Sequence, residues 1–284
     1  MKPRILVTGA SGNTGRPIAE GLASEGFRVR TATRSTTPPF PSADHVLFDW
    51  ADPTTHEPAV DGVDRMYLLL PPLDADPSLL MNPFIERALA RGVRRVVLLS
   101  ASAIPEGSPG LGQVHRFVRE HAPEWSVLQP SWFMQNFANP QNQHGASVRR
   151  DGTLMTSTDK GRVGFVDTAD IAAVGVRALA DEPSHDTAHV ITGPQALSYD
   201  DIAAVMSRVS GRPIRHVHAS QEEVRRHLQE GTGMPEAYAR LLAGLDVTLR
   251  DGAEDRVTDT VLRVTGRAPR TFEAFARAHA HVWR

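Results

Sequence analysis

The sequence contains no cysteine, which excludes a disulfide, a thiolate nucleophile and a cysteine-bound zinc ion. It also has no apolar run near the roughly 18–20 residues that a helix needs to cross a bilayer, and no signal peptide precedes its first predicted strand. The 31 Lys and Arg residues nearly balance the 33 Asp and Glu residues. We therefore expect a cytoplasmic protein that has neither a nucleic acid nor a membrane as a partner.

The most informative segment is the one that opens the chain. Residues 4–8 form an apolar, β-branched run, three glycines follow with the spacing G-x-x-G-x-x-G, and residues 16–25 are compatible with a helix. This order predicts a buried strand that turns into a helix N-terminus, whose N–H groups bind a pyrophosphate. The residues that we expect to contact this dinucleotide are Thr8, Gly9, Ala10, Ser11, Gly12, Asn13, Thr14 and Gly15.

Strand-like and helix-like segments alternate through the first half of the chain. Continuous apolar strands in this rhythm are typical of a parallel sheet covered on both faces. The predicted fold class is therefore α/β, a doubly wound parallel-sheet Rossmann fold. The expected strands are 27–33, 44–49, 65–70, 94–99 and 125–129, and the expected helices are 16–25, 79–91 and 112–121.

The second half is less regular and predicts a smaller C-terminal substrate-binding lobe. The polar residues 138–160 indicate a long loop or hairpin. Further strands are expected at 163–166, 190–192 and 215–218, and helices at 168–180, 199–209, 221–230, 235–242 and 271–281. The predicted division is a Rossmann core of residues 1–134 with return segments near 162–195, and a lobe built from 135–161 and 196–284.

The end of the second predicted strand selects the nucleotide. An acid there binds the ribose 2′-hydroxyl of NAD, whereas an arginine accommodates the 2′-phosphate of NADP. Here the strand is followed by Arg34 and Ser35, with no acid before Asp44. The guanidinium fork of Arg34 suits a phosphate, so we expect NADP(H) to be preferred over NAD(H).

The ends of the next strands extend the expected cofactor site, because ligands of open α/β sheets bind at the carboxyl edge. Asp49 and Trp50 are expected beside the adenine. Leu70 and Pro71 are expected under the ribose. The fifth strand places Ser100, Ala101 and Ser102 near the nicotinamide, although these serines are equally consistent with ordinary strand-end residues.

The tyrosine and lysine pair that short-chain dehydrogenases use for proton donation is absent. That pair needs a lysine four residues after a tyrosine, and these positions hold Pro71, Ala203 and Leu242. His115 is the group between the fifth and sixth strands that titrates near neutral pH, so His115 and Ser102 are the catalytic candidates. His115 could equally decorate a half-exposed helix. Hydride transfer to an iminium carbon needs no proton at all, because it neutralises an existing charge.

Substrate is expected to lie against the segment after the sixth strand. Aromatic and amide side chains there suit a small, cyclic, partly aromatic ligand. We expect Met134 or Phe133 to fill the core instead. The predicted substrate-binding residues are Pro72, His115, Trp132, Phe133 and Asn136.

The chain resembles the NmrA-like atypical short-chain dehydrogenases, and within them the ergot-alkaloid reductase branch of festuclavine and agroclavine dehydrogenases. This resemblance implies NADPH-dependent reduction of an iminium or conjugated substrate in secondary metabolism. Gln129-Pro130 departs from the family, in which arginine-proline is usual. The matching segments are Gly9–Gly15, 32–34, 48–50, 97–102, 112–115, 130–137, 166–172, 193–194 and 198–201.

Two other functions remain open from the sequence. One is reduction of a quinone or an azo compound, and the other is a non-catalytic protein that senses NADP(H) and regulates a partner. A homo-oligomer is compatible with either. His216 and His218 share one face of a predicted strand, but without a third clustered ligand we predict no metal site.

Overall fold

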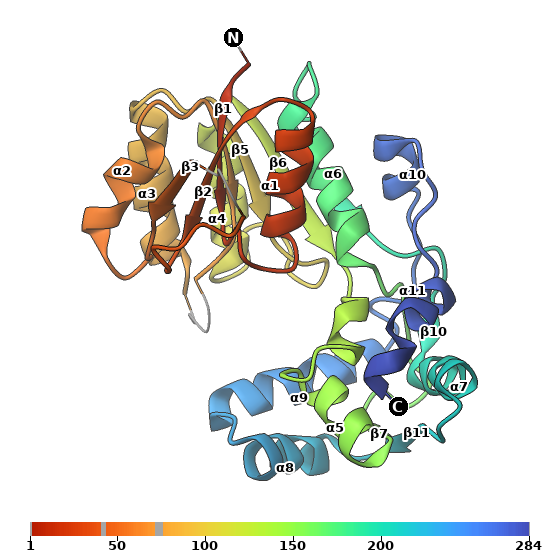
Figure 1. The fold of residues 1–284 in the computed structure, drawn as a ribbon. Coiled ribbons are helices and arrows are strands. Elements are labelled where there is room, and N and C mark those ends of the chain that lie inside the picture. Colours follow the sequence, from red (N-terminus) through yellow and green to blue (C-terminus); the bar gives the residue numbers. More distant parts are fainter. Residues whose placement is uncertain (1, 41–43, 72–75, 284) are drawn as a thin grey trace. The chain divides into compact units, whose positions relative to one another are not determined.

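The computed structural model describes residues 2–40, 44–71 and 76–283. The chain forms two compact units, coloured along the sequence in Figure 1. The first unit contains the residues up to Pro130 together with Thr168–Ile191 and Thr260–Gly266. The second contains Ser131–Asp167, Thr192–Asp259 and the residues from Arg267 onward.

The first unit is built on a parallel sheet with the strand order β3-β2-β1-β4-β5-β6-β9. In the centre of this sheet, Val7 of β1 lies opposite Thr31 and Tyr67 on its two neighbours. The crossover at β1 confirms the predicted doubly wound Rossmann fold. The strands are β1 (Arg4–Thr8), β2 (Arg28–Thr33), β3 (Asp44–Leu47), β4 (Arg65–Leu68), β5 (Arg95–Leu99), β6 (Glu124–Pro130) and β9 (Thr187–Ile191).

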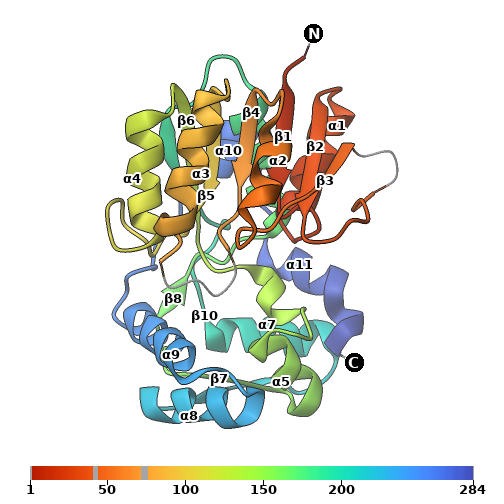
Figure 2. The same cartoon turned by 90° about the vertical axis from the view of Figure 1, so that its left-hand side faces the viewer.

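Helices cover both faces of this sheet, which explains why its strands are apolar throughout. One layer consists of α1 (Gly15–Ser24), α6 (Thr168–Ala180) and α10 (Thr260–Thr265). The other layer, in front of the sheet in Figure 2, consists of α2 (His56–Val60), α3 (Ser78–Ala90) and α4 (Leu111–His121). A short 3-10 turn, Pro53–Thr55, precedes α2.

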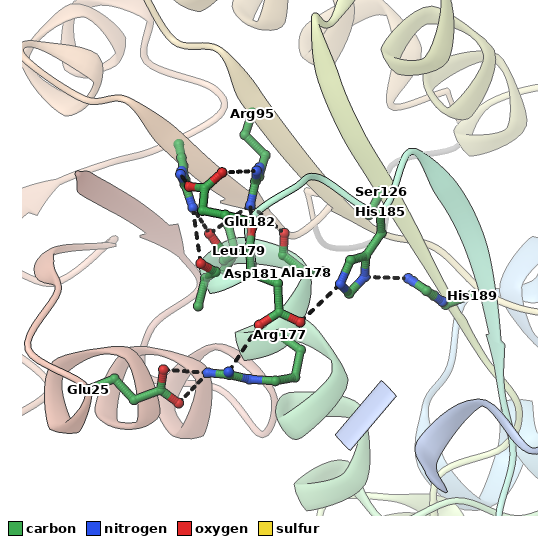
Figure 3. A network of polar contacts seen from close by, with 12 residues as sticks. Glu25, Arg95, Ser126, Arg177, Ala178, Leu179, Asp181, Glu182, His185 and His189 are labelled. Atoms are coloured by element: carbon green, nitrogen blue, oxygen red, sulfur yellow. Dashed lines mark hydrogen bonds and ion pairs between the residues drawn. The ribbon is translucent and has the colours of Figure 1, made fainter. Parts of the chain in front are cut away.

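Two arginines of the sheet satisfy the carbonyl groups at the end of α6 (Figure 3). The side chain of Arg95 is fully buried, and its Nη1 donates to the carbonyl oxygens of Ala178, Leu179 and Asp181 at 3.3, 3.2 and 2.7 Å. Arg65 Nη1 donates to the oxygen of Leu179 at 2.6 Å. The last carbonyls of a helix have no partner within the helix, so these side chains replace the missing hydrogen bonds.

The second unit is mostly helical and has two small sheets. β7 (Thr153–Thr156) pairs with β11 (Arg215–His218) in parallel, and β8 (Arg162–Val163) pairs with β10 (Leu197–Ser198) antiparallel. A buried aromatic cluster that includes Phe137, Tyr199, Phe272 and Trp283 forms its core. The helices are α5 (Gln143–Asp151), α7 (Tyr199–Ser210), α8 (Gln221–Thr232), α9 (Glu236–Arg250) and α11 (Phe272–His279), with 3-10 turns at Met134–Phe137 and Ala280–Trp283.

The prediction of a loop or hairpin over residues 138–160 is wrong. The segment contains α5 and β7, and both ends of α5 carry ordinary helix signals. The Asn142 side chain accepts the N–H of His144 at 3.0 Å, and Gly152 ends the helix with φ +72°. β7 is stabilised by β11, which lies about 60 residues further along the chain.

The two compact units also differ from the division expected from sequence. The boundary after β6 falls at Pro130, and residues 260–266, which we expected in the lobe, belong to the first unit. There α10 packs on α6 and β9 with Val261 buried. The predicted helix at 235–242 is longer than expected, because α9 continues to Arg250.

Candidate cofactor and ligand sites

Glycine is required at both ends of the loop between β1 and α1. Gly9 has φ +61°, and a Cβ on it would lie 2.4 Å from Leu69 Cδ2. A Cβ on Gly15 would lie 2.3 Å from the carbonyl oxygen of Gly9. The loop is therefore folded against itself and against β4 so closely that no side chain fits at either position.

Hydrogen bonds from β4 hold this glycine loop in place. Thr8 Oγ1 donates to the carbonyl oxygen of Tyr67 at 3.1 Å and accepts the N–H of Leu69 at 2.8 Å. The phenol of Tyr67 donates to Thr14 Oγ1 at 2.9 Å. Complete burial raises the pKa of Tyr67 well above its usual range. Tyr67 therefore stays protonated and acts as a structural donor to the loop.

The N-terminus of α1 is prepared for an anion. No side chain caps it, and its first turn holds no acidic residue. The first N–H groups of a helix lack partners within the helix and carry the positive end of its dipole. A phosphate group placed there would receive hydrogen bonds from the backbone.

A cavity of about 690 Å³ in the first unit adjoins this loop. Its lining includes nine residues predicted to bind the cofactor, namely Thr8, Gly9, Ser11, Gly12, Arg34, Asp49, Trp50, Leu70 and Pro71. The other predicted cofactor residues are not among its described lining residues: Ala10, Asn13, Thr14, Gly15, Ser35, Ser100, Ala101 and Ser102. The sequence analysis did not predict five further lining residues, which lie at or shortly after strand ends or, for Leu80, on helix α3. They are Thr33, Phe48, Ala51, Leu69 and Leu80.

Arg34 is exposed and has no ion pair within the described part of the chain. The neighbouring Ser35 hydroxyl accepts the N–H of Thr37 at 3.0 Å. Trp50, by contrast, is largely packed among aromatic rings, and its Nε1–H donates to the carbonyl oxygen of Leu69 at 3.2 Å. Among the described residues, the cavity is thus lined by an exposed cation without an ion pair and by a fixed aromatic ring.

The end of β5 presents the predicted serines. Ser100 is buried, and its hydroxyl has no hydrogen-bond partner within the described residues. Ser102 is half-buried, and its N–H donates to the carbonyl oxygen of Pro130 at 3.0 Å. Ala101 is half-buried between them. A buried hydroxyl without a partner is costly unless a ligand completes it, so this end of the sheet fits a polar group of a cofactor.

His115 is buried rather than half-exposed. Only 3% of its surface is exposed, neither ring nitrogen has a hydrogen-bond partner in the described chain, and the Glu106 carboxylate is 3.9 Å from Nε2. Burial lowers the pKa of His115. It does not line the cavity beside the glycine loop. Pro72 lies outside the described residues.

A second cavity, of about 380 Å³, lies within the second unit. Trp132 and Asn136, both predicted to bind substrate, line it, whereas Phe133 does not. Met134 is buried in the core. Aromatic and titratable side chains that the sequence interpretation missed complete the wall, namely His144, Tyr199, Tyr238 and Asp246.

Asp246 of α9 is the buried acid of this second cavity. Its exposed fraction is 8%, its Oδ2 accepts the N–H of Ser157 at 2.9 Å, and burial raises its pKa to about 6. Burial lowers the pKa of His144 to about 4 and raises that of Tyr199 well above its usual range. At neutral pH the His144 ring and the Tyr199 phenol are therefore uncharged, and Asp246 carries a negative charge.

The structure also brings Asp200 to the predicted histidine pair. Potential ligand atoms of Asp200, His216 and His218 lie within 4.8 Å of one another. Both ring nitrogens of His216 already have protein partners, Thr156 Oγ1 at 2.7 Å and Asp200 Oδ1 at 3.2 Å. Hydrogen bonding thus accounts for the orientation of the buried ring.

Comparison with known proteins shows the family of the chain. The model of the NmrA-like family matches residues 112–276, which is more than half of the chain. The chain belongs to the NmrA-like family. A model described as NAD(P)H-binding matches residues 9–182, so the first cavity is that of an NAD(P)H-binding protein. At the position where Gln129 departs from the family, its Nε2 donates to the carbonyl oxygen of Ile104 at 3.0 Å.

Full-length relatives of this NmrA-like protein are oxidoreductases. It is 43% identical over 279 residues to the uncharacterized oxidoreductase YesF of Bacillus subtilis, covering 98% of this chain and 96% of that one. It is 36% identical over 287 residues to the agroclavine dehydrogenase of Claviceps fusiformis, covering 98% of both chains. The protein is therefore an NAD(P)H-dependent oxidoreductase of the same family.

The fold of this NmrA-like protein is shared by solved structures. An NADPH-dependent quinone oxidoreductase from Escherichia coli, solved with NADPH, has a TM-score of 0.82 at 18% identity, covering 99% of this chain and all of the other. At this identity the likeness concerns the fold. Among the described helices none is both long and apolar enough to span a membrane.

Proposed function

We propose that the protein is an NADPH-dependent reductase that transfers hydride to the carbon of a small cyclic iminium, imine or conjugated C=C group. The observation that carries the cofactor assignment is Arg34 beside the glycine loop, which is exposed and has no ion pair among the residues that the structure describes. No acidic side chain occupies the end of β2 to bind a ribose 2′-hydroxyl, and a guanidinium there suits a 2′-phosphate. The full-length agroclavine dehydrogenase relative supports the type of hydride acceptor.

Different residues of the first unit would bind different parts of the nucleotide. The Gly9–Gly15 loop and the N-terminus of α1 would hold the pyrophosphate, and Arg34 would hold the 2′-phosphate. The unpartnered hydroxyl of Ser100 and the neighbouring Ser102 would orient the nicotinamide end. The bound dihydronicotinamide supplies the hydride, which carries two electrons and one hydrogen to the acceptor carbon.

The protein's own contribution is mainly binding and orientation. Burial raises the pKa of Tyr67 and of Tyr199, so both phenols are weaker acids than an exposed tyrosine, and no lysine stands four residues after either to lower the pKa. Hydride addition turns an iminium cation into a neutral amine and consumes no proton, which matches a site without a tyrosine–lysine pair. Reduction of a conjugated C=C group would need a proton, and Ser102 is the candidate that we retain, because His115 is buried and lines neither cavity.

The test is NADPH oxidation followed at 340 nm with a panel of cyclic iminium, quinone and azo compounds. We expect turnover of iminium compounds above the other two classes. Turnover confined to quinones or azo compounds would reject the proposed hydride acceptor and indicate a quinone or azo reductase. NADPH binding without oxidation across the whole panel would instead indicate an NADP(H)-sensing protein.

A further inference from the structure

The second cavity combines aromatic walls with one buried carboxylate. Trp132, Tyr199 and Tyr238 supply rings, and Asn136 supplies an amide. Asp246 is the acid among its described lining residues, and no lysine or arginine lines it. A negative charge enclosed by aromatic rings is the environment that recognises a flat organic cation, because both the carboxylate and the ring faces attract positive charge.

The carboxylate of Asp246 has no cationic partner within the described chain. Its Oδ2 accepts a hydrogen bond from the neutral N–H of Ser157. An unpaired buried carboxylate destabilises a fold because the charge loses its hydration. Asparagine could accept the same N–H without that cost. Because the Asp246 carboxylate destabilises the fold and lines a cavity, we infer that its role is in binding.

We propose that Asp246 is the counter-ion of a cationic, planar, partly aromatic substrate, which the cavity holds against Trp132 and Tyr238. This inference rests on the proposed function, since it selects the iminium cation from the acceptor classes named above. The amide of Asn136, which also lines the cavity, offers a hydrogen bond to a polar substituent of the ring system. The cavity of about 380 Å³ accommodates two to three fused rings.

The pH dependence of binding follows from the same arrangement. The titratable groups that line the cavity with Asp246 are His144 of α5, Tyr199 of α7 and Tyr238 of α9. Because the pKa of His144 is about 4, that ring is uncharged from pH 5 to 8. Affinity for a permanent cation should therefore rise as Asp246 ionises, near pH 6.

The experiment measures binding of N-methylisoquinolinium and of its uncharged isostere 2-methylnaphthalene by calorimetry, with NADP present. For the intact protein we expect the cation to bind more tightly at pH 8 than at pH 5. In Asp246→Asn the cation should lose about ten-fold or more in affinity at pH 8 while the isostere is unchanged. Asp246→Glu keeps the charge and should restore part of the preference. Asp251→Asn, an exposed acid just after α9, is the matched control and should change neither.

Two outcomes would overturn the inference. One is an equal change in affinity for both probes in Asp246→Asn, and the other is no change for the cation. Turnover of N-methyl-3,4-dihydroisoquinolinium separates this failure from failure of the proposed function. Turnover with an unchanged KM in Asp246→Asn rejects the counter-ion but keeps the reductase. Cation binding that depends on Asp246, without NADPH oxidation, keeps the counter-ion but rejects the reductase.

Discussion

Tyr67 on β4 donates a hydrogen bond to Thr14 Oγ1 at 2.9 Å, and both side chains are buried. This bond ties the centre of the sheet to the residue that precedes α1. The conformation of the glycine loop is thus supported from a strand more than 50 residues further along the chain. Tyr67 therefore supports the glycine loop between β1 and α1.

Removing that support should loosen the loop. Tyr67→Phe leaves the buried Thr14 hydroxyl without its donor, so we expect a loss of about 1–2 kcal/mol in the free energy of unfolding. The affinity for NADPH should fall as well, which titration of cofactor fluorescence would measure. Unchanged urea unfolding and unchanged affinity would show that the bond contributes nothing to the loop.

Gly15→Ala should abolish dinucleotide binding. The new Cβ would lie 2.3 Å from the oxygen of Gly9, so the loop must open to accept it. Gly244→Ala is the matched control, because Gly244 lies within α9 and the nearest atom to its new Cβ would be Nε2 of Gln221, on α8, at 3.8 Å. The control should keep its NADPH affinity and gain about 0.5–1 kcal/mol in stability from its better helix propensity. Tight NADPH binding by Gly15→Ala would argue against the pyrophosphate site.

Arg34→Ala should change the nucleotide preference. Loss of the guanidinium removes the partner of the 2′-phosphate, so the Kd for NADPH should rise by about ten-fold or more while that for NADH stays constant. Arg28→Ala, an exposed arginine at the start of the same strand, should change neither value. A constant ratio of the two dissociation constants in Arg34→Ala would reject the assignment of NADP(H).

Asp246→Asn should stabilise the protein in a pH-dependent manner. The pKa of this carboxyl is raised to about 6 in the folded state from 3.8. As pH rises, the Asp246 carboxyl therefore loses its proton in the unfolded chain before it does so in the folded protein. The free energy of unfolding falls between about pH 4 and pH 6, and above that range the loss is about 3 kcal/mol. The variant should be more stable than the parent at pH 8 and equal to it at pH 4, as measured by denaturant unfolding. Greater stability of the parent at pH 8 would show that Asp246 serves the fold.

Arg95→Met should destabilise the first unit strongly. The change removes the Arg95 side chain from Glu124, which its Nε contacts at 2.7 Å, and from the carbonyl oxygens of Ala178 and Asp181, while Leu179 keeps its hydrogen bond from Arg65. We expect a loss of about 3–5 kcal/mol in unfolding free energy. Arg94→Met, its exposed neighbour, should change stability by less than about 0.5 kcal/mol. Equal effects of the two substitutions would contradict the capping role.

Features that depend on neighbouring residues could be predicted from the sequence alone. The glycine loop, the run of apolar strands and the arginine after β2 are local signals, because a turn, a buried strand or a strand end is determined within a few residues. Helix α6 and strand β11 have the bounds that the sequence pattern predicts. The predicted cofactor residues that line the first cavity come from these strand ends.

Features that depend on distant segments needed the tertiary structure. β7 acquires its strand conformation from pairing with β11, and α10 joins the first unit through its packing on α6 and β9. Asp246 reads as an ordinary helix acid in the sequence. It becomes a buried charge, without an ion pair in the described part of the chain, because α9 brings it to a cavity that Trp132 and Tyr199 also line. Local sequence thus determined the glycine loop and the strand ends around the first cavity, whereas long-range packing decided which charge is buried beside the second, since burial is a property of the assembled chain.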